Sequence, residues 1–226
     1  MMLHIPQVLD KTTIANLRQQ LETSDAWVDG RETVGAQGAE VKQNLQLTDI
    51  SPLKHELGQI ILAALQRNPL FFAAALPAKI LPPRFNRYAN GGTYGYHIDG
   101  SIMSLQQGEQ LRSDISCTLF INEPDEYEGG ELSVSDTYGE HTVKLPAGDL
   151  ILYPSSSLHC VTPVTKGARL AAFFWIQSLV RNENERRTLF ELDTAITRLR
   201  DTNADRAAIV QLTGTYHNLL RKWAET

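Results

Sequence analysis

The sequence predicts an α+β protein in which an antiparallel β core follows one helical region and precedes another. Three observations predict this fold class: helical spacing of apolar residues within 1–78, short β-rich runs separated by turns within 79–179, and helical spacing again within 180–226. Many short strands at close spacing are typical of an antiparallel sandwich or barrel. A chain of 226 residues, 42% hydrophobic and 21% charged, is expected to form one globular domain with an appendage.

Residues 1–78 are expected to form an N-terminal helical support region with two helices. The first has apolar residues at helical spacing behind a polar cap, namely Ile14, Leu17 and Leu21 behind Asp10 or Thr12. The second begins with Ser51 as its cap and Pro52 in its first turn, and it ends at an Asn-Pro pair at 68–69. Its apolar face comprises Leu53, Leu57, Ile60, Ile61 and Leu65.

Residues 79–179 are expected to form the β core. Their short runs are rich in β-branched and aromatic residues: ILPPRFNRY, ISCTLFIN, GELSVSD, HTVKL, DLILYP and LAAFFWIQSL. Turn residues separate these runs: Asn90-Gly91-Gly92, Gly129-Gly130, Tyr138-Gly139 and Ala147-Gly148-Asp149.

Residues 180–226 are expected to form a C-terminal helical extension, a hairpin that begins near residue 182. Each helix carries an apolar stripe: Leu189, Leu192, Ile196 and Leu199 on the first, and Ile209, Leu212, Tyr216, Leu219 and Trp223 on the second. The turn between them is expected at Asp201-Thr202-Asn203. The stripes fit two arrangements, because the hairpin can cover the core or form an interface between copies of a homo-oligomer.

Charge and composition argue against several classes of partner. A net charge of −5 and an isoelectric point near 5.7 disfavour general nucleic-acid binding, which usually shows a basic surface. The longest uncharged apolar stretch, Leu70 to Ala78, is too short to span a membrane. The N-terminus lacks the pattern of a signal peptide. Cys117 and Cys160 are expected to be buried and unpaired, which favours a reducing compartment, the cytoplasm.

The chemistry of the sequence centres on His97 and Asp99, two residues apart in the run YGYHIDGSIM. On a strand both side chains would share one face. Such a pair is either a simple hydrogen-bonded pair or half of a metal site. His159, 62 residues further on, follows a serine-rich loop and opens another strand. Two imidazoles and one carboxylate form the facial triad that holds Fe(II) and leaves coordination positions open.

Arg169 follows His159 by ten residues and precedes the apolar run LAAFFW. A guanidinium inside a β barrel requires an anionic partner, and its planar fork suits a bidentate contact with a carboxylate. A dicarboxylic co-substrate could therefore bind the metal at one end and Arg169 at the other. The alternative for Arg169 is a surface salt bridge.

These residues resemble the iron(II)- and 2-oxoglutarate-dependent dioxygenases of the prolyl-hydroxylase-like branch. The stretches NRYANGGTYGYHID, TLFINEPDEYEGGEL and GDLILYPSSSLHCVTPV are similar to that branch. With its helical C-terminal extension, the chain is most similar to the bacterial PKHD-type hydroxylases, which are associated with iron uptake. The resemblance covers most of the chain and is strongest over 79–179. It implies a double-stranded β-helix, or jelly-roll, core.

The resemblance also implies a role for individual residues. His97, Asp99 and His159 would bind Fe(II), and Arg169 would pair with the distal carboxylate of 2-oxoglutarate. Tyr88 matches a tyrosine that contacts the co-substrate, and Trp175 would form a wall of the pocket. Some relatives carry a second tyrosine where this chain has Phe120, so that hydroxyl contact is absent here.

The implied reaction is a hydroxylation with O2 that converts 2-oxoglutarate to succinate and CO2, with L-ascorbate as a further cofactor. The substrate is left open between a peptide, an amino acid and a siderophore-like small molecule. A base demethylase is disfavoured, since the next arginine after Arg169 is Arg181, beyond the strand. A different class of function, a non-catalytic iron-responsive module that binds a metal or ligand, remains as the alternative.

Overall fold

Two antiparallel sheets form the core of the protein in the computed structural model, which describes residues 1–33, 36–104, 108–202 and 204–225. The strands of the larger sheet are, in order, β1 (Leu3–Ile5), β14 (Leu150–Pro154), β10 (Ile115–Phe120), β17 (Ala168–Ser178), β6 (Arg84–Ala89), β4 (Leu45–Leu47) and β2 (Trp27–Asp29), and β5 (Pro77–Ile80) also pairs with β17. Those of the smaller sheet are β13 (Gly139–Val143), β12 (Leu132–Asp136), β15 (Leu158–Val161), β7 (Thr93–His97) and β3 (Lys42–Gln43).

The two sheets pack as a jelly roll, which confirms the expected core. Two short pairs complete the strands of the described residues: β11 (Glu128–Gly129) with β16 (Val164–Lys166), and β8 (Ile102–Ser104) with β9 (Gln110–Arg112). Short 3-10 turns lie at η1 (Gly30–Thr33) and η3 (Pro124–Glu126). A cluster of buried aromatic and aliphatic residues from both sheets, including Tyr88, Phe120 and Val161, fills one end of the space between them.

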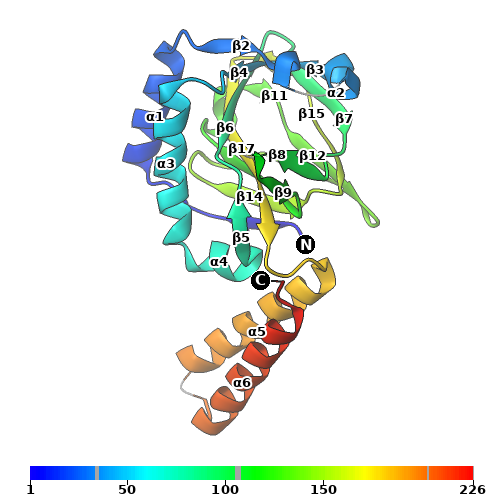
Figure 1. The fold of residues 1–226 in the computed structure, drawn as a ribbon. Coiled ribbons are helices and arrows are strands. Elements are labelled where there is room, and N and C mark those ends of the chain that lie inside the picture. The colour runs from blue at the N-terminus through cyan, green and yellow to red at the C-terminus, as the bar shows by residue number, and fades with distance from the viewer. Residues whose placement is uncertain (34–35, 105–107, 203, 226) are drawn as a thin grey trace.

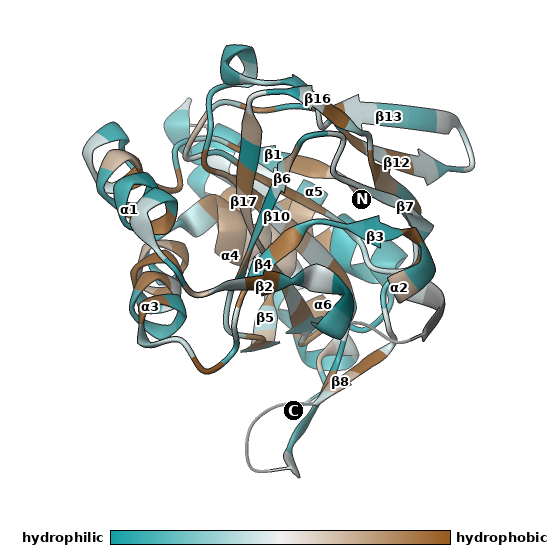
Figure 2. Cartoon of the chain, turned by 90° about the horizontal axis from the view of Figure 1, so that it is seen from above, coloured by the Kyte–Doolittle hydropathy of each residue, from teal (hydrophilic) through white to brown (hydrophobic). Residues whose placement is uncertain are grey.

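Three helices cover the outer face of the larger sheet: α1 (Lys11–Thr23), α3 (Pro52–Gln66) and α4 (Pro69–Ala75) (Figure 1). The alternation of side chains along β17 explains this packing. Leu170, Ala172, Phe174 and Ile176 join the same apolar cluster as the helices, whereas Arg169 and Trp175 lie on the opposite face. Figure 2 shows the helices beside hydrophobic central strands, while β13 at the edge of the smaller sheet is mostly hydrophilic.

The two expected N-terminal helices are confirmed as α1 and α3. Asp10 caps α1 by accepting a hydrogen bond from the Thr13 amide at 2.7 Å. Ser51 is the cap residue of α3 but makes no side-chain capping bond, so Pro52 is the stronger signal of that start. The structure adds strands that were not expected in the N-terminal region, since β1, β2, β3 and β4 all join the two sheets.

A pair of antiparallel helices, α5 (Glu183–Asp201) and α6 (Arg206–Trp223), forms the expected C-terminal hairpin and projects away from the sheets (Figure 1). Of its expected turn, Asn203 lies outside the described residues. Every helix among the described residues is too short or too polar to cross a membrane. Cys117 and Cys160 are buried and free, as expected.

Candidate functional site

His97, Asp99 and His159 lie together inside the jelly roll. Among the described residues they form a group whose potential ligand atoms all lie within 4.8 Å of one another. His97 Nε2 is 4.0 Å from Asp99 Oδ1, and His159 Nε2 is 3.7 Å from Asp99 Oδ2. These separations are too long for hydrogen bonds and leave space for an ion between the three groups. The sequence prediction that these three side chains converge is therefore correct.

The two histidines lie on neighbouring strands of the smaller sheet, β7 and β15. His97 is the last residue of β7, and it pairs in register with His159 on β15. Asp99 lies two residues beyond the end of β7, so of the pair only His97 sits on a strand. The chain turns after His97, and the carboxylate comes back toward the imidazoles.

Backbone carbonyls fix the orientation of both imidazoles. His97 Nδ1 is 2.8 Å from the Gly95 carbonyl oxygen, and His159 Nδ1 is 3.0 Å from the Ser157 carbonyl oxygen. A carbonyl can only accept, so each Nδ1 carries the proton and donates it. Each Nε2 then keeps its lone pair on the side of Asp99. This tautomer, with the proton on Nδ1, is the one that a metal ligand requires.

Electrostatics also keeps His97 in the neutral form. Burial and the neighbouring His159 lower the pKa of His97 from its usual 6.5 to about 4. The Tyr94 ring stacks on His97 with ring centroids 3.6 Å apart. Ser116 on β10 donates a hydrogen bond of 2.6 Å to Asp99 Oδ2, which orients the carboxylate.

Arg169 lies on β17 beside Tyr88 of β6, its registered partner in the sheet. The side chain is only 1% exposed, and it has no ion-pair partner among the described residues. Its guanidinium carbon is 5.4 Å from the centre of the Tyr88 ring and 5.3 Å from that of Phe120. Its Nε has no hydrogen-bond partner. The surface salt bridge considered from the sequence is therefore wrong, because the guanidinium is buried between two aromatic rings.

One cavity of about 810 Å³ connects these groups. His97, Asp99, His159, Arg169 and Tyr88 all line it, together with Trp175, which is 8% exposed. The structure thus brings every sequence-predicted site residue to a single cavity. The remaining histidines do not join it: His4 bonds to Asp149 at 2.7 Å, and His55, His141 and His217 are exposed on other elements.

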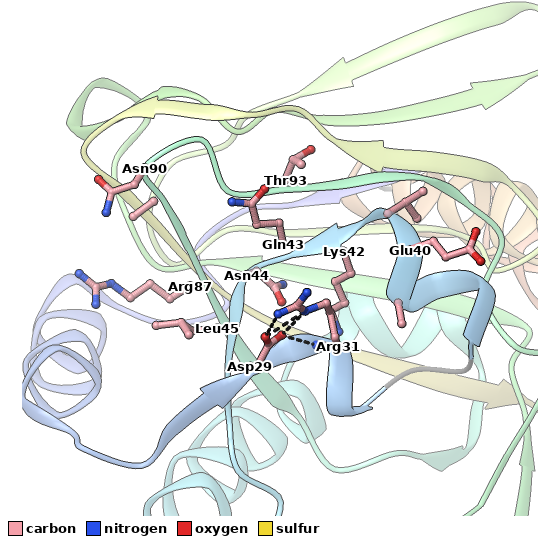
Figure 3. A pocket seen from close by; sticks show the side chains of 13 residues that line it. Asp29, Arg31, Glu40, Lys42, Gln43, Asn44, Leu45, Arg87, Asn90 and Thr93 are labelled. Carbon is pink, nitrogen blue, oxygen red and sulfur yellow. Dashed lines mark hydrogen bonds and ion pairs between the residues drawn. The ribbon is translucent and has the colours of Figure 1, made fainter.

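Two further residues of the cavity were missed from the sequence. Ser116 carried a signal, because Ser116 and Thr118 alternate with apolar residues in the run ISCTLFIN and so mark one polar face of a strand. Lys42 carried none, since it lies in a strand of only two residues. Lys42 also lines a second pocket, of about 770 Å³, together with Asp29, Arg31 and Glu40 (Figure 3).

Comparison with known proteins identifies relatives along the whole chain. Residues 83–177 match the 2OG-Fe(II) oxygenase superfamily, and residues 183–225 match the PKHD-type hydroxylase C-terminal domain. A PKHD-type hydroxylase of Stenotrophomonas maltophilia strain R551-3 is 65% identical over 225 residues and covers 100% of both chains. One from Xylella fastidiosa strain M23 is 60% identical over 231 residues, again with 100% of both chains covered.

Solved structures with the same fold have much lower sequence identity. A Pseudomonas putida prolyl-4-hydroxylase aligns with 78% of this chain and 92% of its own, at a TM-score of 0.54 and 17% identity. The 2-oxoglutarate complex of a viral collagen prolyl hydroxylase from Paramecium Bursaria Chlorella virus-1 aligns with 78% of this chain and 95% of its own, at a TM-score of 0.54 and 18% identity. These two likenesses support the fold.

Proposed function

The chain belongs to the PKHD-type hydroxylases of the 2OG-Fe(II) oxygenase superfamily, and we propose that His97, Asp99 and His159 hold its Fe(II) while Arg169 binds 2-oxoglutarate. Membership makes the protein a dioxygenase that uses iron, 2-oxoglutarate and O2. The observation that carries the residue assignment is the convergence of two Nε2 lone pairs and one carboxylate on a common point.

The donor set fits iron rather than a structural metal. Imidazole nitrogen and carboxylate oxygen are the ligands of the facial triad, and only three protein ligands leave positions for co-substrate and O2. A structural zinc site would instead close a tetrahedron, usually with cysteines. Cys160 directly follows His159 on β15, so the two side chains point to opposite faces.

The buried guanidinium supports the co-substrate assignment. A charged group that is 1% exposed requires an anionic partner, and the described residues supply none to Arg169. The distal carboxylate of 2-oxoglutarate would meet this need. We assign Tyr88 to the same end of the cavity, because its ring flanks the guanidinium and its hydroxyl accepts a bond of 3.3 Å from Asn86.

Fe(II), when bound, supplies the activation of O2 that couples loss of CO2 from 2-oxoglutarate to oxidation of a C–H bond. The protein's own residues position and protect this chemistry. The Gly95 and Ser157 carbonyls hold the imidazoles, Ser116 holds Asp99, and apolar residues of the cavity wall limit the access of water.

The proposal includes finer points that rest on the resemblance in the sequence. We propose a peptide, amino acid or siderophore-like substrate, L-ascorbate as the reductant that keeps iron active, and a link to iron uptake. Cys117 and Cys160 are buried and free, which supports a location in the cytoplasm, a reducing compartment. We divide the chain into an N-terminal support region (1–78), an oxygenase core (79–179) and a C-terminal extension (180–226), which the matches at 83–177 and 183–225 support.

The test is an anaerobic titration with Fe(II) and 2-oxoglutarate, followed by exposure to air. We expect a visible charge-transfer band and then succinate. Asp99→Ala should remove both signals, whereas His217→Ala, which removes an exposed imidazole from α6, should leave them unchanged. A band without any succinate would favour the non-catalytic binding module, and a full signal from Asp99→Ala would contradict the assigned ligands.

A further inference from the structure

The cavity has a second positively charged region besides Arg169. Lys42 of β3 and Arg84 of β6 both line it, so one cation comes from each sheet. Lys42 is 5% exposed, and its ammonium donates a bond of 3.1 Å to Gln46 and lies 5.2 Å from the centre of the Tyr94 ring. Because Tyr94 stacks on His97, this ammonium is one aromatic ring away from the proposed metal site.

Strand register shows how far Arg84 lies from Arg169. In the pairing of β6 with β17, Arg169 is opposite Tyr88 and Phe173 is opposite Arg84. The two positions are four residues apart on the same face of the strand pair, which corresponds to roughly 13 Å at the rise of a β-strand. A five-carbon diacid held by Arg169 and the metal does not reach that far, so Arg84 is placed to contact another group.

Two of the nearby acids are already engaged, whereas a third, Glu40, lines the cavity beside Lys42. Asp49 accepts a bond of 3.0 Å from Arg84 but also pairs with Lys54 at 2.7 Å, so one carboxylate is shared by two cations. Asp29 is held by Arg31 through two contacts, of 3.0 and 2.9 Å, to the Arg31 Nε (Figure 3). Burial and the charge of Arg84 lower the pKa of Lys42 to about 8. At this end of the cavity two cations, Lys42 and Arg84, therefore outnumber the one carboxylate of Glu40.

Another part of the rim of the cavity is apolar and open to solvent. Tyr96, Ile98 and Leu158 are 52, 60 and 42% exposed, and all three line the cavity on the side of the smaller sheet. Exposed apolar side chains gathered at the rim of a deep pocket mark a surface that a ligand covers. A ligand that satisfies both features has an apolar skeleton and an anionic group.

We propose that the primary substrate is an amphipathic carboxylate, whose anionic group binds between Lys42 and Arg84 while its apolar part covers Tyr96, Ile98 and Leu158. This inference rests on the proposed function, since it places the substrate in the cavity that holds iron and 2-oxoglutarate. It also predicts selection against cationic groups, such as a free lysyl side chain, because two fixed positive charges would repel them.

The experiment uses matched probes of one shape and different charge. Protein is loaded with Mn(II) and the unreactive co-substrate analogue N-oxalylglycine, which occupies Arg169. Calorimetric titration then compares phenylacetate, phenylacetamide and phenethylammonium. We expect phenylacetate to bind at least about tenfold more tightly than the amide, and the ammonium compound to bind weakest. Lys42→Met and Arg84→Gln should each remove most of this preference.

Lys166→Met is the matched control, because its ammonium pairs with Glu128 and its side chain is 77% exposed. It should keep the full preference for the anion. Thermal melts and retained binding of N-oxalylglycine show that each variant is folded, and Lys42→Arg provides a variant that keeps the charge and should keep the preference. Equal binding of acid and amide, or a preference that survives both Lys42→Met and Arg84→Gln, would overturn the proposal. Failure to load Mn(II) and N-oxalylglycine would instead overturn the proposed function and this inference with it.

Discussion

The protonation state of His97 shows how burial prepares a single residue for its proposed role. Its pKa is lowered to about 4 by burial and by His159, so the folded protein resists protonation of a ring whose unfolded pKa is 6.5. The unfolded chain then binds more protons than the folded protein between these two values. The free energy of unfolding must fall as the pH falls through this window.

We therefore predict that the metal-free protein loses stability between about pH 6.5 and pH 4, with a melting temperature lower by about 5 °C or more. The part of the loss that is due to His97 should level off below pH 4, where the ring is protonated in both states. Thermal denaturation at a series of pH values measures it, and His97→Asn should flatten the profile relative to the parent. Parallel profiles for the two proteins would show that His97 is not the group responsible.

A second prediction at this scale concerns Arg169. Replacing Arg169 with Ala should weaken 2-oxoglutarate binding by roughly 100-fold, because a bidentate charge-assisted contact is lost, while metal binding is retained. The comparison ligand is 2-oxopentanoate, which lacks the distal carboxylate and should bind parent and variant alike. Equal losses for both ligands would mean that Arg169 supports the shape of the cavity rather than the carboxylate.

The sequence was sufficient to predict four residues that meet in one cavity. His97, Asp99, His159 and Arg169 were predictable because their types and spacings suit one kind of site, and the structure brings them to one cavity. Lys42 was not predictable, because a lysine beside polar residues is ordinarily a solvated one. Only the fold, which places β3 at the edge of the smaller sheet, buries this ammonium in the cavity.

At the scale of elements, the turn before β12 depends on glycine. Gly129 of β11 has φ +72°, and a Cβ added there would lie 1.9 Å from the Pro163 carbonyl oxygen. The strand partner β16 begins at Val164, directly after this contact. A side chain would therefore separate the two short strands as well as strain the backbone.

We predict that Gly129→Ala costs at least about 2–3 kcal/mol of the free energy of unfolding, measured by urea denaturation. Gly214→Ala is the matched control. Gly214 lies within α6 with no atom near the added Cβ, so this change should be neutral or should stabilise by up to about 1 kcal/mol. A neutral Gly129→Ala would mean that β11 and β16 can separate at no cost.

Element length explains which strands the sequence predicted. The long runs that became β10, β14 and β17 were clear, because they have enough β-branched and aromatic residues to define a pattern. The strands β1, β2, β3 and β4 have two or three residues each, too few for any periodicity. They form because neighbouring strands offer hydrogen bonds, as β14 does to β1. Pairing with a strand that is distant in the chain leaves no pattern in the local sequence.

At the scale of the whole molecule, the chain has a well-packed core and a lightly packed C-terminal hairpin. Residues of β10 and β17 are almost all buried, and they belong to a cluster that extends through α1, α3 and α4. In contrast, α6 has no buried residue, and the cluster that joins the hairpin to the rest has three buried members, Leu76, Val180 and Leu189. The local free energy of opening should follow this difference in burial.

We predict from this contrast that amides of α6 exchange with solvent much faster than those of β10 and β17 under native conditions. Bonds at the base of the hairpin link it to the core: the Glu225 amide donates to the Leu179 carbonyl at 2.8 Å, and Arg186 donates to the Val180 carbonyl at 2.8 Å. Native-state hydrogen exchange measures the difference in the full-length protein.

Because association would cover the stripe on α6, the same measurement at increasing protein concentration separates the two arrangements considered for the hairpin. Protection of α6 that rises with concentration indicates an interface between copies, and protection equal to that of the central strands at every concentration would contradict a lightly packed hairpin.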